Sequence, residues 1–111
     1  MDSRLKYVKT SRQVLKEYLD FYQRLGFSNI RPLFDDTRQS YMLLDIGWYN
    51  KKYIHNATIH LEIIDGKIWI QHDDTEAGVA TSLLEHGVPH EDIVLGFQPP
   101  EMRPYTEFAV V

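Results

Sequence analysis

The sequence predicts an α+β protein in which an antiparallel β-meander of about four to five strands carries an N-terminal helix and a second helix on one face. Three observations predict this class: an amphipathic opening segment, alternating apolar and polar residues through the middle of the chain, and a capped helical segment after them. The 111 residues have the length of one domain, so we expect a single unit spanning residues 1–111. A hydrophobic share of 43% and a charged share of 25% are typical of globular proteins.

The opening segment predicts a helix that runs from Ser3 to about Leu25. Ser3 is a suitable N-cap, and Gly26 suits the left-handed position after the last turn. Apolar residues recur at spacings of three and four, which marks one buried face. That face is Val8, Leu15, Tyr18, Leu19, Tyr22 and Leu25.

The charge of the chain is unevenly distributed along its length. Residues 1–54 carry ten Lys/Arg and six Asp/Glu, a balance of +4, whereas residues 55–111 carry two and ten, a balance of −8. Neutralisation of phosphates dominates DNA affinity, so any nucleic-acid contact is expected in the first half. The candidates are Lys9, Arg12 and Lys16, which form a stripe beside the apolar face of the helix. A solvated flank, whose aliphatic stems cover the edge of the core, is the interpretation we favour.

Two segments with strand periodicity follow the helix. Ile30–Phe34 predicts a short edge strand, because Pro32 has no amide proton to donate to a neighbour. Ser40–Trp48 alternates, and one of its faces is Met42, Leu44, Ile46 and Trp48. After a reversal at residues 49–52, we expect Leu44 to lie across from Ala57 and Met42 across from Ile59. This face is predicted to be the core.

The dipeptide Asp65-Gly66, placed between two alternating runs, predicts a type I′ hairpin turn. The resulting register pairs Ile63 with Ile68, Leu61 with Ile70, His60 with Gln71, and Ile59 with His72. In this register His55 and His72 face the core. Trp69 lies on the opposite, mostly polar face, where either the C-terminal tail covers it or it belongs to an oligomer or partner surface.

A second helix is predicted from Asp73 to about His86. Asp73 and Glu76 have capping-box spacing, and Gly87-Val88-Pro89 contains the residues that end a helix. The inward residues are predicted to be Ala77, Ala80, Leu83 and Leu84. Ile93–Phe97 then has the length of a short strand, and an extended tail follows it.

The sequence contains no catalytic motif that we can identify. There is no cysteine, none of the five histidines has metal-ligand spacing, and neither a phosphate-binding glycine loop nor a G-x-S-x-G elbow occurs. No catalytic residue, metal ligand or cofactor is therefore predicted. A small hydrolase that uses His60, Glu62 and Asp73 is an alternative, provided that the three side chains converge. The chain has no apolar run of membrane-spanning length and no apolar leader, so we expect a soluble, cytoplasmic protein.

Several segments together resemble the XisI family of cyanobacterial excision controlling factors. They are Asp45–Trp48, Ile59–Leu61, Asp65–Gln71, Thr75-Glu76, Gly87–Pro89, Glu91–Phe97, Pro99–Arg103 and Tyr105–Val110, and the opening helix is also similar. The resemblance implies a role in excision of the fdxN element during heterocyst differentiation. It also implies two other proteins, a site-specific recombinase and the companion protein XisH, whose fold looks nuclease-like.

The resemblance and the residues together predict a non-catalytic accessory protein that binds an XisH-like partner. The residues expected to bind the partner are Trp69, Pro99, Pro100, Glu101, Met102, Arg103 and Tyr105. Because Trp69 and the apolar C-terminus are unlike a solvated surface, we also expect a homodimer. The alternative is a module that binds DNA directly through its basic residues Lys9, Arg12, Lys16, Arg31 and Arg38.

Overall fold

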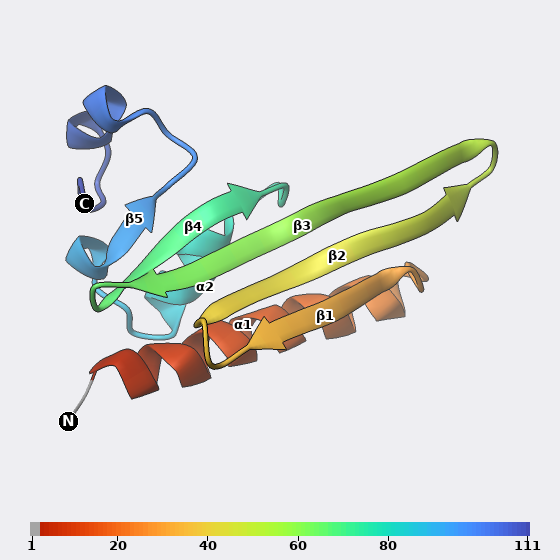
Figure 1. Cartoon of the computed structure of the whole chain (residues 1–111), viewed down its shortest axis with the longest axis horizontal. Coiled ribbons are helices and arrows are strands. Elements are labelled where there is room, and N and C mark those ends of the chain that lie inside the picture. The colour runs from red at the N-terminus through yellow and green to blue at the C-terminus, as the bar shows by residue number, and fades with distance from the viewer. Residues whose placement is uncertain (1–2) are drawn as a thin grey trace.

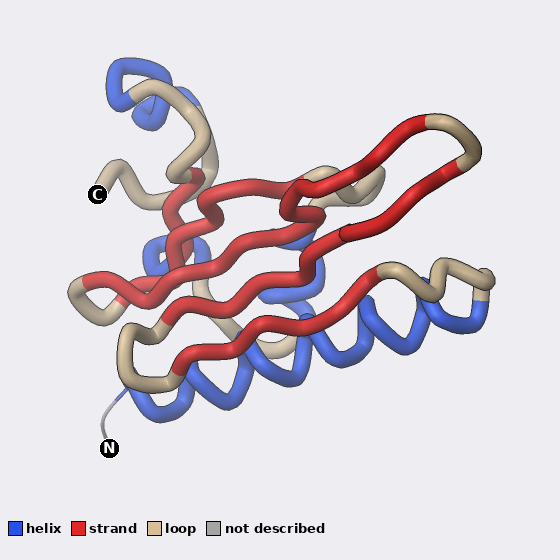
Figure 2. The backbone as a smooth tube through the Cα atoms, turned by 45° about the vertical axis from the view of Figure 1, so that its right-hand side comes forward, coloured by secondary structure: helices blue, strands red, loops and turns tan. Residues whose placement is uncertain are grey.

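The computed structural model describes residues 3–111, which form a five-stranded sheet with both α-helices on one face (Figures 1 and 2). The strand order is β1-β2-β3-β4-β5; the first four strands are antiparallel, and β5 is parallel to β4. This arrangement confirms the predicted α+β class. The elements are α1 (Ser3–Arg24), β1 (Ile30–Asp35), β2 (Ser40–Tyr49), β3 (Lys52–Ile64), β4 (Lys67–Asp73), α2 (Val79–Glu85), the 3₁₀ helix η1 (His90–Asp92), β5 (Ile93–Leu95) and the 3₁₀ helix η2 (Pro100–Tyr105).

Helix α1 packs along the sheet through a face close to the predicted one. Its buried residues are Tyr7, Ser11, Val14 and Leu15, and Val8, Tyr18, Leu19 and Tyr22 pack against them. The helix ends as predicted: Gly26 has φ 92°, and the amide of Phe27 donates to the Tyr22 carbonyl at 3.0 Å. Leu25, which was expected in the core, lies beyond the helix and is 58% exposed. The capping role predicted for the side chain of Ser3 lies outside the described residues.

The predicted core face of β2 is wrong, because Tyr41 and Leu43 point toward the helices and are fully buried. A β-bulge causes the difference. Leu44 pairs with Ala57 as expected, but Thr58 is an extra residue, so Leu43 pairs with Ile59 and Met42 with His60. An extra residue moves every later side chain of a strand to the other face. The face of Met42, Leu44, Ile46 and Trp48 therefore lies on the side without helices.

The β3–β4 hairpin confirms the predicted turn and the first part of the register. Asp65 and Gly66 have φ values of 51° and 79°, as a type I′ turn requires, and Leu61 pairs with Ile70. Gln71 is a second bulged residue, so His60 pairs with His72 and Ile59 with Asp73. His55 and His72 are exposed rather than part of the core. The predicted pairs His60–Gln71 and Ile59–His72 are thus also wrong.

Helix α2 begins at Val79, six residues later than predicted, because Asp73 caps it from a distance. One carboxylate oxygen of Asp73 accepts from the backbone amide and the hydroxyl of Thr75 at 2.9 and 2.6 Å, and the other accepts from the Val79 amide at 2.7 Å. The predicted capping box with Glu76 is not formed. Gly87, at φ 90°, ends the helix as expected. Of the predicted inward residues, Leu83 is buried, Ala80 and Leu84 pack against the core, and Ala77 is exposed.

The C-terminal tail folds back onto the edge of the sheet beside β5. Strand β5 spans only Ile93–Leu95, so the predicted strand to Phe97 is too long by two residues. The amide of Ala109 donates to the carbonyl of Ile93 at 2.9 Å, and Ala109 forms a parallel bridge with Val94. Between these contacts the chain makes the turns of η2, drawn in dark blue beyond β5 in Figure 1.

Candidate functional site

The residues predicted to bind a partner divide into a contacting pair, half-buried Trp69 on β4 and buried Arg103 in the tail, and an exposed group in the tail. The guanidinium carbon of Arg103 lies 5.1 Å from the centre of the Trp69 ring. Arg103 is only 9% exposed, and it donates to the carbonyls of Val110 at 3.3 Å and Gly96 at 3.4 Å. Trp69 and Arg103 thus hold the tail on the sheet. The exposed group is Pro99, Pro100, Glu101, Met102 and Tyr105, with Tyr105 at 84% exposure.

The basic stripe of α1 is partly used by the fold itself. One guanidinium nitrogen of Arg12 lies 3.1 Å from the Asp36 carboxylate, and the guanidinium carbon stacks 5.1 Å from the centre of the Phe34 ring. Arg12 therefore fastens α1 to the first hairpin. Lys9 and Lys16 are exposed.

The hydrolase alternative fails on geometry. The Ser40 hydroxyl lies 2.8 Å from Nε2 of His60, and a Glu62 oxygen lies 3.6 Å from the same nitrogen. In a Ser-His-acid triad the serine and the acid contact opposite ring nitrogens, so Glu62 does not orient this histidine. Asp73 bonds to the start of α2 on the other side of the sheet. The three predicted residues do not share a pocket.

Among the residues that the structure describes, no three His, Asp or Glu side chains come together to hold a metal ion. No helix in this described part is long and apolar enough to cross a membrane.

An apolar face remains uncovered on the side of the sheet opposite the helices. We call it the open face; it consists of Leu33, Met42, Leu44, Ile46, Trp48 and Tyr53. Trp48 is 66% exposed, and its ring centre lies 5.2 Å from that of Tyr53. The β2–β3 hairpin that carries this pair projects past the rest of the sheet (Figure 1). The sequence pattern identified Met42, Leu44, Ile46 and Trp48 as one apolar face but assigned that face to the core.

The exposed residues of η2 stand on the same side of the sheet as the open face. Ile68 and Ile70 are buried toward the helices, so Trp69 between them points away from the helices. Since Arg103 lies over Trp69, the tail covers that end of the sheet on its open side. The open face and η2 therefore lie on the same side of the sheet.

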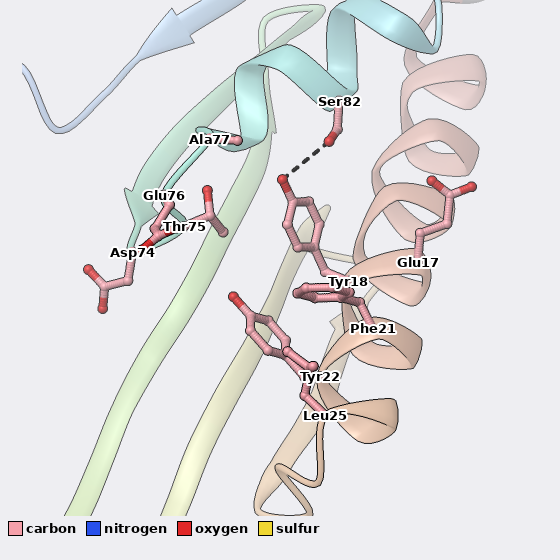
Figure 3. A pocket seen from close by; sticks show the side chains of 10 residues that line it. All are labelled: Glu17, Tyr18, Phe21, Tyr22, Leu25, Asp74, Thr75, Glu76, Ala77 and Ser82. Atoms are coloured by element: carbon pink, nitrogen blue, oxygen red, sulfur yellow. Dashed lines mark hydrogen bonds between the residues drawn. The ribbon is translucent and has the colours of Figure 1, made fainter.

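A cleft of about 660 Å³ lies on the helix side of the molecule, between α1 and residues 74–77 (Figure 3). We call it the aromatic cleft; its lining is Glu17, Tyr18, Phe21, Tyr22, Leu25, Asp74, Thr75, Glu76, Ala77 and Ser82. The Tyr18 and Ser82 hydroxyls are 3.2 Å apart, which ties α1 to α2 across its upper end. This site was not predicted from the sequence, although the aromatic residues near the end of α1 were a usable signal.

The electrostatic character of the aromatic cleft is negative. Burial raises the pKa of the Tyr22 phenol, and the nearby Tyr18, Asp73 and Asp74 raise this pKa further. Each of these effects disfavours an additional negative charge on the phenol. Three carboxylate residues, Glu17, Asp74 and Glu76, belong to the lining, and neither Lys nor Arg does among the described residues.

Comparison with known proteins supplies the family. Residues 1–110 match the family described as XisI protein. The structure is similar to that of the fdxN element excision controlling factor XisI from Anabaena variabilis ATCC 29413, with a TM-score of 0.87 and 35% identity over 99% of this chain and 100% of that one. It is also similar to a XisI-like protein from the same organism, with a TM-score of 0.81 and 35% identity over 97% and 99% of the two chains. Among curated proteins, no sequence matches. By its sequence along almost the whole length and by its fold, the chain belongs to the XisI family.

Proposed function

We propose that this protein is a non-catalytic, cytoplasmic accessory factor that controls site-specific DNA excision by binding an XisH-like protein. The observation that carries the proposal is the open face, where six apolar side chains lie on a sheet surface that no helix covers. Contiguous exposed apolar surface marks protein interaction sites. The XisI structure from Anabaena variabilis is named as an excision controlling factor for the fdxN element, which supports excision of that element as the process. We propose that this excision takes place during heterocyst differentiation.

Binding to a protein fits this surface better than binding to DNA. Aromatic residues and methionine are enriched in protein interfaces, and Trp48, Tyr53 and Met42 are of these types. A DNA-binding surface needs clustered cations, whereas the chain carries a net charge of −4. We propose that any link to DNA, and to a site-specific recombinase, runs through the partner. The exposed residues of η2 extend the binding surface.

Co-expression with an XisH-like protein tests the proposal. The two proteins should co-purify at mild salt, and Trp48→Glu should abolish the complex because it places a charge in an apolar contact. Leu5→Glu is the matched control, since Leu5 is 62% exposed on α1, away from the open face. Circular dichroism should show that both variants fold. Lack of association of the unmodified chain, or full association of Trp48→Glu, would contradict the proposal.

A second copy of the chain is the occupant that we propose for the open face when no partner is present. Edge-to-edge pairing at β1 is disfavoured, because Pro32 removes a backbone donor there, so face-to-face packing is the better route to a homodimer. Light scattering should then give twice the chain mass of 13.1 kDa, and Trp48→Glu should give the monomer. A monomer for the unmodified chain at all concentrations would exclude this dimer.

Direct DNA binding by α1 is the alternative, and the exposure of Lys9 and Lys16 favours it. It requires retention of duplex DNA that weakens steeply with salt and is lost when both lysines become glutamate. Arg12 and Arg38 are less available to phosphates, because they pair with Asp36 at 3.1 Å and Asp35 at 3.3 Å.

A further inference from the structure

We propose that the aromatic cleft binds an arginine or lysine side chain on a basic segment of a partner protein. The cleft lies on the helix side of the sheet and is separate from the open face. The inference rests on the proposed function in one respect, namely that the ligand is part of a protein. Beyond that function, it specifies that the bound segment of the partner is basic.

The shape and lining of the cleft suit a long cationic side chain. Its volume of 660 Å³ falls within the range of about 300–1,000 Å³ that is typical of binding sites. Tyr18, Phe21 and Tyr22 form one wall; the ring centres of Tyr18 and Tyr22 are 6.3 Å apart, and those of Phe21 and Tyr22 are 5.8 Å apart. The negative face of an aromatic ring attracts ammonium and guanidinium groups. Phe21 is 48% exposed, so its ring is accessible from solvent.

The carboxylates around the cleft provide charge complementarity. Figure 3 shows the side chains of Glu17 and Asp74 on opposite sides of the cleft. These two carboxylates contact His86 at 2.9 Å and His72 at 3.0 Å, while Glu76 makes no ion pair within residues 4–111. Glu76 is therefore the carboxylate of the lining that we expect to form a charge-assisted hydrogen bond with an entering cation, which would also contact the rings.

The surroundings of the cleft favour a polypeptide segment over a small organic cation. Leu25 and Phe27 continue the apolar surface at the end of α1, and the Phe27 ring packs edge-on against Tyr22 at 6.2 Å. Apolar residues next to the basic residue in the bound segment would pack on Leu25 and Phe27, in the way that apolar side chains of a peptide pack in a hydrophobic groove. A segment that alternates leucine with arginine has the required character.

Titration of the ¹⁵N-labelled protein with such a leucine–arginine hexapeptide tests the inference. Amide shifts should change in the second half of α1 and in residues 74–82, and the hexapeptide with glutamate in place of arginine should leave them unchanged. Glu76→Lys and Phe21→Ser should each weaken binding at least tenfold. Asp20→Lys is the matched control: Asp20 is exposed on the same helix and outside the lining, so this variant should bind like the unmodified chain.

The results separate this inference from the proposed function. The inference is overturned if the arginine peptide leaves these amides unchanged, if the glutamate peptide binds equally tightly, or if Glu76→Lys retains full affinity for the arginine peptide. Peptide binding in the cleft without any association of the XisH-like protein would support the inference and refute that partner. Undiminished binding of the XisH-like protein to Glu76→Lys would place the contact elsewhere and leave the proposed function intact.

Discussion

Arg103 allows the attachment of the tail to be tested with a single substitution. Its guanidinium lies over Trp69 and donates to two carbonyls, one in Gly96 before η2 and one in Val110 near the C-terminus. Methionine keeps most of the aliphatic volume and removes the charged group. The variant Arg103→Met therefore isolates the contribution of the guanidinium from that of simple space filling.

The contacts of the guanidinium set the expected magnitude. A hydrogen bond from a charged donor contributes about 1.5–3 kcal/mol, and the distances of 3.3 and 3.4 Å place both bonds near the lower value. The cation–π contact adds about 1 kcal/mol at a half-buried ring. Two unfavourable effects oppose these contributions: Nε of Arg103 is buried without a hydrogen-bond partner, and the positive charge itself is buried. Together they cancel about 2 kcal/mol of the stabilisation. We expect Arg103→Met to lower the free energy of unfolding by about 2 kcal/mol.

Tryptophan fluorescence measures both the stability and the position of the tail. In a Trp48→Phe background Trp69 is the only tryptophan, and the change is mild because Trp48 is 66% exposed. Arg103→Met should lower the urea midpoint and make Trp69 more accessible to acrylamide. Arg31→Met, at an exposed arginine on β1, is the control. If quenching and midpoint both stay at the control values, the guanidinium does not hold the tail.

Three further predictions concern other contacts of the fold. Asp73→Ala removes the acceptor of the first amide of α2 and should lower the unfolding free energy by about 1–2 kcal/mol in thermal melts, whereas Asp74→Ala, at an exposed carboxylate, should not. Burial and the hydrogen bond to Asp92 raise the pKa of Tyr7 to about 12, above the ordinary tyrosine pKa of 10.0. The resulting stabilisation is complete below pH 10.0 and is lost as the pH rises toward 12. Urea midpoints of Tyr7→Phe should therefore fall less between these pH values, and an equal fall would contradict the assignment. Gly96→Ala would place Cβ 3.2 Å from a backbone oxygen of β4 and should cost about 1–3 kcal/mol in chemical unfolding; unchanged stability would show that the strand yields.

Features set by a few neighbouring residues could be predicted from the sequence. Gly26, Asp65-Gly66 and Gly87 all take the left-handed conformation that the predicted helix ends and hairpin turn require. Their chemistry is local, because a positive φ favours glycine whatever the rest of the chain does. The cap of α2 was predicted at the right residue, Asp73, but with the wrong helix start, because the intervening loop wraps around its carboxylate.

The assignment of faces in the sheet could not be predicted in the same way. Both faces of β2 are apolar, with Tyr41 and Leu43 on one and Met42 and Leu44 on the other, so periodicity alone does not choose between them. The choice depends on the bulge at Thr58, a residue type that gives no sign of a bulge in the sequence. The aromatic cleft was missed for a related reason, since residues 17–25 and 74–82 meet only through tertiary packing.

Because the face of β2 that carries Trp48 lies outside the core, substitutions on it can change binding without changing the stability of the fold. Had Trp48 been in the core, its replacement would have removed stability and binding together. On the open face Trp48 contacts Tyr53 on the projecting hairpin and is otherwise exposed to solvent. A partner that covers Trp48 would therefore gain the free energy of burying its ring. The buried residues Tyr41 and Leu43 stabilise the same strand from its other side. Substitutions at Trp48 should therefore change association while the unfolding transition stays in place, and this pattern distinguishes an interface residue from a core residue.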